Sequence, residues 1–162
     1  DNLKKWINDN KERLEKIWSK IEGKKEYGIR IYFEKDRLLQ EASEDKEIRE
    51  IEESLQEKSQ GLRYLLQSKA KSKIDEIARN RINQFKRKFY DDIKKITDEI
   101  KVNTSRIFID EEKDLLLSLS ILVNNQQISK IKKKLEQKCS NDFSFQLTGP
   151  FAPYSFVENE TA

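Results

Sequence analysis

Apolar residues follow a helical spacing in some stretches of this chain and alternate in others, and each change of period predicts a new element. From residue 2 to 22 they recur three and four positions apart, which is typical of an amphipathic helix, and Gly23 is suited to end it. Over residues 27–33 every second residue is a large apolar one. This stretch is therefore predicted to be a strand with one face on a core.

Helical spacing returns in the middle of the chain. A short helical turn is predicted at residues 36–40 and a helix at 44–58, after which Gly61 breaks or kinks the path. The longest apolar stripe then runs over residues 61–100. At about 1.5 Å per residue an unbroken helix of that length would span roughly 60 Å. Because such a rod is longer than a domain of this size is wide, part of it should project beyond the sheet.

A projecting apolar stripe needs something to cover it. We expect the stripe around Phe85 and Phe89 to pair with the helix at residues 2–22, with the 44–58 helix as a further partner, as a helical hairpin or short coiled coil. The stripe could instead pair with another chain.

The last third of the chain returns to strand spacing. Residues 106–109 and 115–123 are predicted to form an antiparallel hairpin, followed by a helix at 125–138 and a strand at 143–148. The succession of strand, long helix, strand, strand, helix and strand is the split βαβ pattern of ferredoxin-like folds. The predicted fold class is therefore α+β, an antiparallel ferredoxin-like sheet with long amphipathic helices, in a single domain over residues 1–162.

Residues 149–157 are the most sharply patterned stretch, because both prolines of the chain, Pro150 and Pro153, stand there among aromatic residues. The pattern predicts a rigid corner after the last strand and then a second short extended piece. Two functions are open. The segment is either a structural clasp that folds back over the domain, which we favour, or a hook that binds a partner. Its aromatic anchors are Phe151, Tyr154 and Phe156.

The amino-acid composition argues against most kinds of active site. The chain has no histidine, one cysteine and four glycines. This leaves little with which to build a transition-metal site, a catalytic triad or a phosphate-binding glycine loop. The single thiol, Cys139, has no histidine to activate it, and neighbouring carboxylates such as Asp91 and Asp92 are expected by chance among 30 acidic residues. We therefore expect no enzyme activity, no catalytic, cofactor-binding or metal-binding residues, and no cofactor.

Charge and hydropathy narrow the choice of partners. The 33 basic and 30 acidic residues give a net charge of +3 without the clustered excess of a duplex-binding protein. The sequence contains no run of about 18 apolar residues, the length that a membrane-spanning helix needs. Ferredoxin-like sheets can bind RNA through aromatic residues on their open face, for which Tyr32 and Phe108 are candidates, but the strand at 115–123 carries Leu and Ser there. We expect neither a nucleic-acid nor a membrane partner.

Four blocks of the sequence, in the same order, resemble the gas vesicle protein family GvpL/GvpF. Residues 149–157 are similar to the family's ending of the type Gly-Pro-Trp-Pro-Pro-Tyr-Ser-Phe-Val, with Phe151 and Ala152 where the family often has Trp and Pro. Residues 26–32 resemble its Glu-Trp-Gly-Val-Lys-Val strand, with Tyr27 in place of the Trp.

The other two blocks lie between these. Residues 61–69 are similar to the family's Gly-x-x-Tyr-Leu-Leu-x-x-Lys helix start. The apolar run at 117–123, followed by residues 127–135, resembles its strand leading into an amphipathic helix. Together the resemblance covers roughly residues 3–157, nearly the whole chain.

The resemblance implies a modified ferredoxin-like domain in a gas vesicle accessory or minor structural protein. Such a protein would take part in gas vesicle assembly in a prokaryotic cytoplasm, with the small hydrophobic major shell protein and other accessory vesicle proteins as its partners. Family members normally carry another domain before the helix that begins here at Asp1, so this chain is expected to be a piece of a longer protein. The positions that match the family's motifs, and hence the candidate partner-binding residues, are Tyr27, Gly28, Gly61, Tyr64, Gly149, Pro150, Phe151, Pro153, Tyr154 and Phe156.

Two alternatives remain at this point. The chain could be a coiled-coil scaffold unrelated to gas vesicles, or a ferredoxin-like RNA-binding module. Genes for vesicle shell proteins beside the gene for this chain would favour the family assignment over both.

Overall fold

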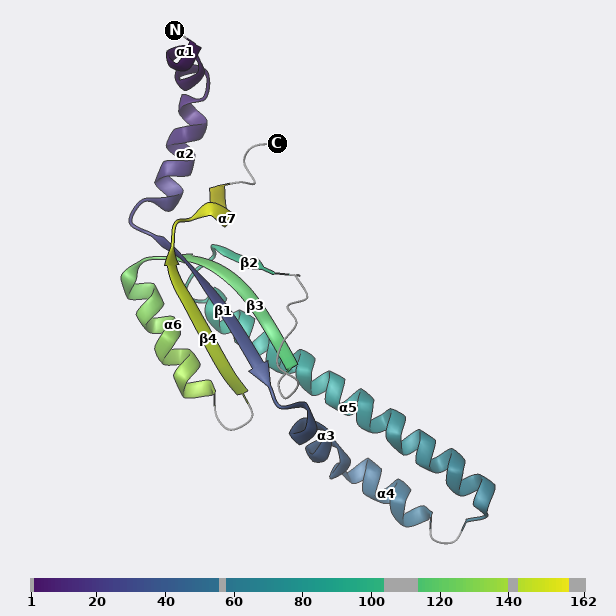
Figure 1. Cartoon of the computed structure of the whole chain (residues 1–162). Coiled ribbons are helices and arrows are strands. Elements are labelled where there is room, and N and C mark those ends of the chain that lie inside the picture. The colour runs from purple at the N-terminus through teal and green to yellow at the C-terminus, as the bar shows by residue number, and fades with distance from the viewer. Residues whose placement is uncertain (1, 56–57, 104–113, 140–142, 158–162) are drawn as a thin grey trace.

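A computed structural model describes residues 2–55, 58–103, 114–139 and 143–157. The molecule is elongated, with a sheet at its middle and helices that project from both ends (Figure 1). The N-terminal helices lie at one end, and a pair of helices from the middle of the chain lies at the other.

The sheet has four antiparallel strands in the order β2-β3-β1-β4. Strand β1 spans Lys25–Phe33 and β3 spans Asp114–Val123, and these two form the centre. Strand β4, Phe143–Phe151, lies outside β1 as one edge, and the short β2, Ile100–Val102, lies outside β3 as the other. The predicted strand at 106–109 falls outside the described residues, so its predicted hairpin with 115–123 is not described. In the described part of the chain, β3 pairs antiparallel with β1 on one side and with β2 on the other.

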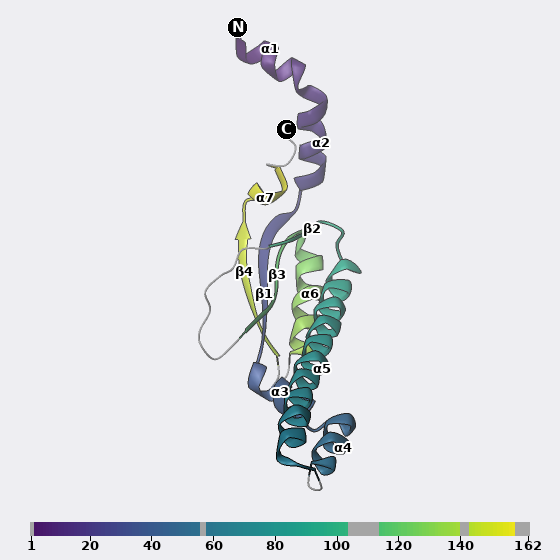
Figure 2. The same cartoon turned by 90° about the vertical axis from the view of Figure 1, so that its right-hand side faces the viewer.

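One face of this sheet is covered by two helices (Figure 2). As the period of two predicts, Ile29, Ile31 and Phe33 of β1 all point to that face and are buried. The residues of β3 that pair with Ile29 and Ile31 point to the same face. The helices that close the core are α5, Gln60–Lys94, and α6, Asn125–Lys138. The side chains that they bury there are Phe89, Ile93, Ile131 and Leu135.

Helix α6 has the range predicted for it, and its start has a clear local cause. The Asn124 side chain accepts a hydrogen bond from the Gln127 N–H at 2.9 Å, and the Gln127 side chain accepts one from the Asn124 N–H at 3.0 Å. This reciprocal pair is a capping box, which satisfies two backbone donors that a helix start leaves open.

Helix α5 is 35 residues long, about 52 Å, and it packs against different partners along its length. Its C-terminal half lies on the sheet, and its N-terminal half extends past the sheet beside α3, Lys35–Ser43, and α4, Lys46–Ser54 (Figure 1). Apolar residues of all three helices are buried there, namely Leu38, Ala42, Ile48, Ala70 and Ala78. Ion pairs flank them, with Arg81 3.5 Å from Glu41 and Lys73 3.3 Å from Glu47.

The end of α5 differs from the prediction. The helix ends at Lys94, and Ile100, which continues the helical spacing in the sequence, lies in β2 opposite Ile121. The backbone turns over residues 95–99, where the Thr97 hydroxyl donates to the Leu122 carbonyl and accepts from the Glu99 N–H, both at 3.2 Å. Strand pairing therefore overrides the local helical pattern.

The N-terminal stretch forms two helices, α1, Asn2–Asp9, and α2, Lys11–Ile21. They are separated at Asn10, whose backbone leaves the helical region with φ of −109° and ψ of 9°. Its side-chain amide donates to the Trp6 carbonyl at 2.8 Å, and the same carbonyl also accepts from the Asn10 N–H at 3.1 Å. Gly23, with φ of +69°, follows α2 and turns the chain into β1.

The predicted pairing of the 2–22 helix with the long helix is wrong. Helices α1 and α2 project from the end of the sheet opposite to α4 and the start of α5 (Figures 1 and 2). Phe85 instead packs on Phe143 of β4, with ring centroids 4.6 Å apart. Beyond its first turns, where Leu62 and Leu65 are exposed, the apolar stripe of the long helix is covered by α3, α4 and the sheet, and α1 and α2 are largely exposed.

We expect the substitution Phe89→Ala to lower the free energy of unfolding by roughly 3 to 5 kcal/mol, because Phe89 is buried between α5 and the sheet. Its matched control on the same helix is Leu65→Ala, whose side chain is 64 % exposed and whose loss should change stability by less than about 0.5 kcal/mol. Urea denaturation of both variants measures this. Equal losses would contradict the described core.

Candidate functional site

The residues that match the family motifs lie in two separate places. Tyr27 and Gly28, on β1, lie beside the end of β4 and the segment that follows it. Gly61 and Tyr64 lie in the first turns of α5, at the far end of the molecule (Figure 1). The structure therefore brings the motifs at 26–32 and 149–157 together, beside the 117–123 strand, and leaves the motif at 61–69 apart from them.

Two glycines permit a close approach between β1 and β4. A Cβ on Gly28 would lie 2.6 Å from the Thr148 hydroxyl oxygen, and a Cβ on Gly149 would lie 2.9 Å from both the Glu26 carbonyl oxygen and Cδ1 of Tyr27. Gly149 also has φ of +116°, which favours glycine. The ring of Tyr27 therefore packs where any other residue at 149 would carry its side chain.

Strand β4 runs through this point instead of ending before it. The predicted corner at 149 is not found, because β4 continues to Phe151, with a register shift between Glu26 and Gly28 of β1. Pro150 is tolerated because β4 is an edge strand and needs no donor on its outer side. The predicted second extended piece is instead a short helix, α7, Tyr154–Val157.

Helix α7 is clasped to the sheet by a buried carboxylate. The Ser155 N–H donates to the Glu26 side chain at 3.0 Å, and the Ser155 hydroxyl donates to the same carboxylate at 2.5 Å. The Lys101 ammonium donates to the Ser155 carbonyl and lies 5.4 Å from the ring centroid of Phe156, which is 2 % exposed. Glu26 and Lys101 lie on the face of the sheet opposite to α5 and α6, so α7 covers one end of that face.

Only one of the three predicted aromatic anchors is an anchor. Phe156 is buried, whereas Phe151 is 53 % and Tyr154 is 72 % exposed, so the prediction is wrong for these two residues. The segment thus combines a buried clasp with aromatic side chains that are open to a partner. Sequence reasoning missed Glu26, Lys101 and Ser155 as clasp residues. Their contacts join positions up to 129 residues apart, for which no local pattern exists.

Two further apolar surfaces lie at the ends of the molecule. At the start of α5, Leu62, Tyr64 and Leu65 are 42 %, 74 % and 64 % exposed. On α1 and α2 the exposed apolar residues are Leu3, Trp6, Ile7, Leu14 and Trp18. Exposed large apolar side chains that cluster in this way are typical of protein-interaction surfaces.

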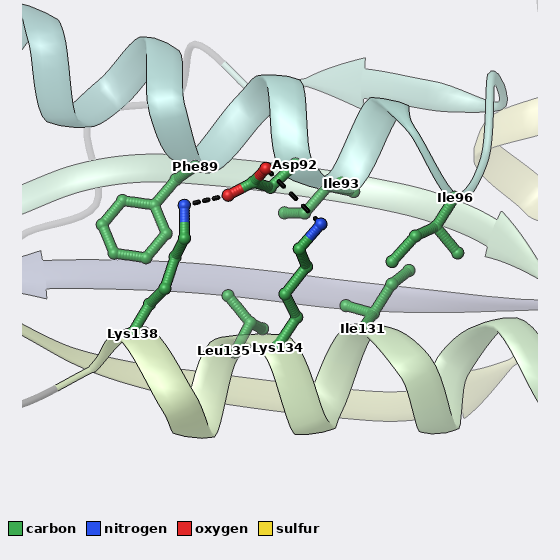
Figure 3. Close-up of a pocket in the computed structure, with 8 residues that line it drawn as sticks. All are labelled: Phe89, Asp92, Ile93, Ile96, Ile131, Lys134, Leu135 and Lys138. Atoms are coloured by element: carbon green, nitrogen blue, oxygen red, sulfur yellow. Dashed lines mark hydrogen bonds and ion pairs between the residues drawn. The ribbon is translucent and has the colours of Figure 1, made fainter.

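A narrow pocket between α5 and α6 has a structural role (Figure 3). The Asp92 carboxylate of α5 lies 3.4 Å from the Lys134 ammonium and also pairs with Lys138, both on α6, and the rest of the lining is apolar. The pocket holds about 10 Å³, which is room for about one water molecule. The ion pairs join the two helices, and the pocket between them is too small for an organic ligand.

The described residues contain no group of three or more His, Cys, Asp or Glu side chains placed to hold a metal ion. None of the helices in the described part of the chain is both long and apolar enough to cross a membrane. Burial raises the pKa of the Cys139 thiol above its usual range, which disfavours the reactive thiolate.

We expect Phe156→Ala to lower the free energy of unfolding by about 3 kcal/mol, since it removes the buried anchor of α7. Glu26→Gln should cost about 1.5 kcal/mol through loss of the charged acceptor. The control is Tyr154→Ala, an exposed aromatic in the same helix, which should leave stability within about 0.5 kcal/mol. Thermal and urea melts compare the three, and an unchanged melt for Phe156→Ala would contradict the clasp.

Comparisons with known proteins agree on one family. The sequence profile of the family described as gas vesicle synthesis protein GvpL/GvpF matches residues 1–158. Gas vesicle protein L of Haloferax mediterranei is 21 % identical over 159 residues, which cover 94 % of this chain and 49 % of that protein. The chain therefore spans about half the length of this curated relative.

Two solved structures have a similar fold. The crystal structure of GvpF from Anabaena sp. PCC7120 matches with a TM-score of 0.70 and 16 % identity, covering 96 % of this chain and 62 % of that one. GvpF from Microcystis aeruginosa matches with a TM-score of 0.60 and 18 % identity, covering 94 % and 62 %. These similarities show a shared fold of helices and a four-stranded antiparallel sheet. Because the family profile matches nearly the whole chain, the chain belongs to the gas vesicle GvpL/GvpF family.

Proposed function

We propose that this chain is a non-enzymatic accessory or minor structural protein of gas vesicle assembly that binds the major shell protein. The observation that carries the proposal is membership of the GvpL/GvpF family over residues 1–158. Family membership gives a gas vesicle role, and the surface of the molecule supports protein binding as the means.

The exposed apolar surfaces supply the physical basis for binding. Burying apolar area releases about 25 cal/mol per Å², so a hydrophobic partner would gain most from the surfaces where large side chains are exposed. Trp6 and Trp18, at 53 % and 61 % exposure, and Tyr64 on α5 are side chains of this kind. Aromatic residues are also enriched among those that dominate binding energy at interfaces.

The chemistry of the partner follows from the proposed role. A small hydrophobic shell subunit exposes aggregation-prone surface before it joins the growing shell, and an accessory protein that covers this surface would keep it from self-association. We further propose that other accessory vesicle proteins bind the same chain and that it acts in a prokaryotic cytoplasm, where vesicles are assembled. The candidate residues that match the family motifs are proposed as partner contacts where they are exposed, as Tyr64, Phe151 and Tyr154 are.

We also infer that the domain is a modified ferredoxin-like one that includes all of residues 1–162. The strand order β2-β3-β1-β4 and the long helix between β1 and β2 support a split βαβ arrangement. The modification is the insertion of α3 and α4, which lie along the projecting half of α5 and give it a local helical hairpin.

The two alternatives have less support. Family membership argues against a scaffold unrelated to gas vesicles. An RNA-binding module stacks bases on aromatic residues of the open face of its sheet. Here the Tyr32 hydroxyl donates a hydrogen bond to Gln146 Oε1 at 3.3 Å, and β3 carries Ser118 and Ser120 on that face instead of aromatic residues, which argues against RNA binding. Phe108 lies outside the described residues.

We expect deletion of the full-length gene to reduce the number of gas vesicles or change their shape, because unshielded shell subunits would aggregate before assembly. Electron microscopy of whole cells measures both properties. Reintroduction of the intact gene on a plasmid is the control and should restore them. Vesicles of normal number and shape in the deletion strain would rule out the assembly role.

A further inference from the structure

Strand β4 is an unusually open sheet edge. It is nine residues long, and among the strands that the structure describes it pairs only with β1. None of the residues from Phe143 to Phe151 is charged, in a chain of which 39 % is charged. Natural edge strands are usually short or protected by charged side chains, and the opposite edge, β2, has both features, with three residues and Lys101 at its centre.

The direction of the free backbone groups of β4 follows from the pairing across the whole sheet. The Asn103 N–H donates to the Ser118 carbonyl, and the Leu122 N–H donates to the Glu99 carbonyl, so even-numbered residues of β3 point their backbone groups away from β1. Odd-numbered residues of β3, such as Leu119, therefore pair with β1.

The same alternation continues across β1 to β4. Because Ile29 lies opposite Leu119 and points its backbone groups toward β3, the even-numbered residues of β1 point toward β4, where Arg30 lies opposite Gln146. The backbone groups of Ser144, Gln146 and Thr148 are thus used inside the sheet. Those of Phe143, Phe145 and Leu147 point outward from the edge.

We propose that this free edge of β4 binds an extended, uncharged strand of the partner by strand addition. The inference rests on the proposed function, because it assigns the strand to the hydrophobic major shell protein. Unpaired N–H and C=O groups in a row select an extended backbone as their partner, and this is how strand addition gains affinity.

The side chains of β4 define the pattern that the added strand should have. Phe145 and Leu147 are only partly buried and lie on the face of the sheet that α5 and α6 cover, whereas Gln146 is exposed on the other face. An added strand would therefore place apolar side chains beside Phe145 and Leu147 and small polar ones beside Gln146. Helix α6 lies beyond β4 in the helical layer, so the apolar side chains of the added strand would pack on it (Figures 1 and 2).

Because β4 carries no charged residue, its edge is suited to an uncharged strand and not to a charged one. A charged strand would lose hydration beside the phenyl and leucine side chains without gaining an ion pair from β4. Pro150 limits the pairing at the other end, because its ring removes a backbone donor. The added strand should thus be about five to six residues long, running beside residues 143–148.

Amide hydrogen exchange tests the proposal on the unchanged chain. The isotope-labelled chain would be measured alone and in complex with the co-expressed major gas vesicle shell protein. In the free chain the outward N–H groups of Phe145 and Leu147 should exchange much faster than that of Gln146. In the complex the exchange of both outward amides should slow at least tenfold, while that of Gln146 changes little.

A matched pair of variants tests the same point by affinity. Leu147→Ala and Leu147→Pro both remove the leucine side chain, but only the proline removes the outward N–H. Leu147→Pro should bind the shell protein about tenfold more weakly than Leu147→Ala in pull-down titrations. Thermal melts show that both variants are folded, and if the proline variant is not, the exchange measurement decides alone.

The outcomes separate this inference from the proposed function. A complex in which Phe145 and Leu147 remain unprotected would overturn strand addition and leave shell-protein binding in place. Failure to form any complex would overturn both. Protection of the outward amides in the chain alone, together with a dimer in solution, would overturn the shell-protein strand in favour of pairing between two copies of β4.

Discussion

Burial of one apolar face of the sheet is the constraint on which the rest of this structure depends. Ile29 and Ile31 of the central strand β1 and Leu119 and Ile121 of β3 have no exposed surface. Only 35 % of the residues are hydrophobic, and most of the large aliphatic side chains that alternate along the strands point to this face. The C-terminal half of α5 and the whole of α6 lie where they do because they cover it.

The helical segments that do not cover this face project beyond the ends of the sheet. The first half of α5 leaves the sheet and is held by α3 and α4, and α1 and α2 leave from the other end (Figure 1). A long helix braced in this way is stiff, so its tip, with Tyr64 exposed, is held at a distance from the sheet. The result is a small core with apolar side chains displayed far apart, an arrangement suited to contacting several partners or a partner much larger than itself.

Periodicity predicted the elements well wherever a local cause decides them. The strand at 27–33 follows from alternation, and the start of α6 follows from the capping residues Asn124 and Gln127, both visible in the sequence. The end of α5 was not predictable in this way, because Ile100 fits the helical stripe and only its pairing with Ile121 makes it a strand residue. An apolar stripe also says that a helix has a face to cover but not what covers it, which is why the partner of residues 2–22 was wrongly predicted.

The candidate site was predictable only in part, for a similar reason. The glycines at 28 and 149 were identified by their family motifs, and their role became clear only when the structure brought their two strands together. The clasp of Glu26 with Ser155 depends on residues that are ordinary in the sequence and adjacent only after folding. Similarly, the open edge of β4 is defined by the order of strands, which no single strand contains.

Sedimentation of the major shell protein after co-expression with this chain tests most directly whether the chain binds and shields it. If it does, the shell protein should remain in the supernatant and elute together with the chain from a sizing column. The control is co-expression with an unrelated protein of similar size, which should leave the shell protein in the pellet. If the shell protein sediments equally with and without this chain, the chain does not shield it, and the central claim is contradicted.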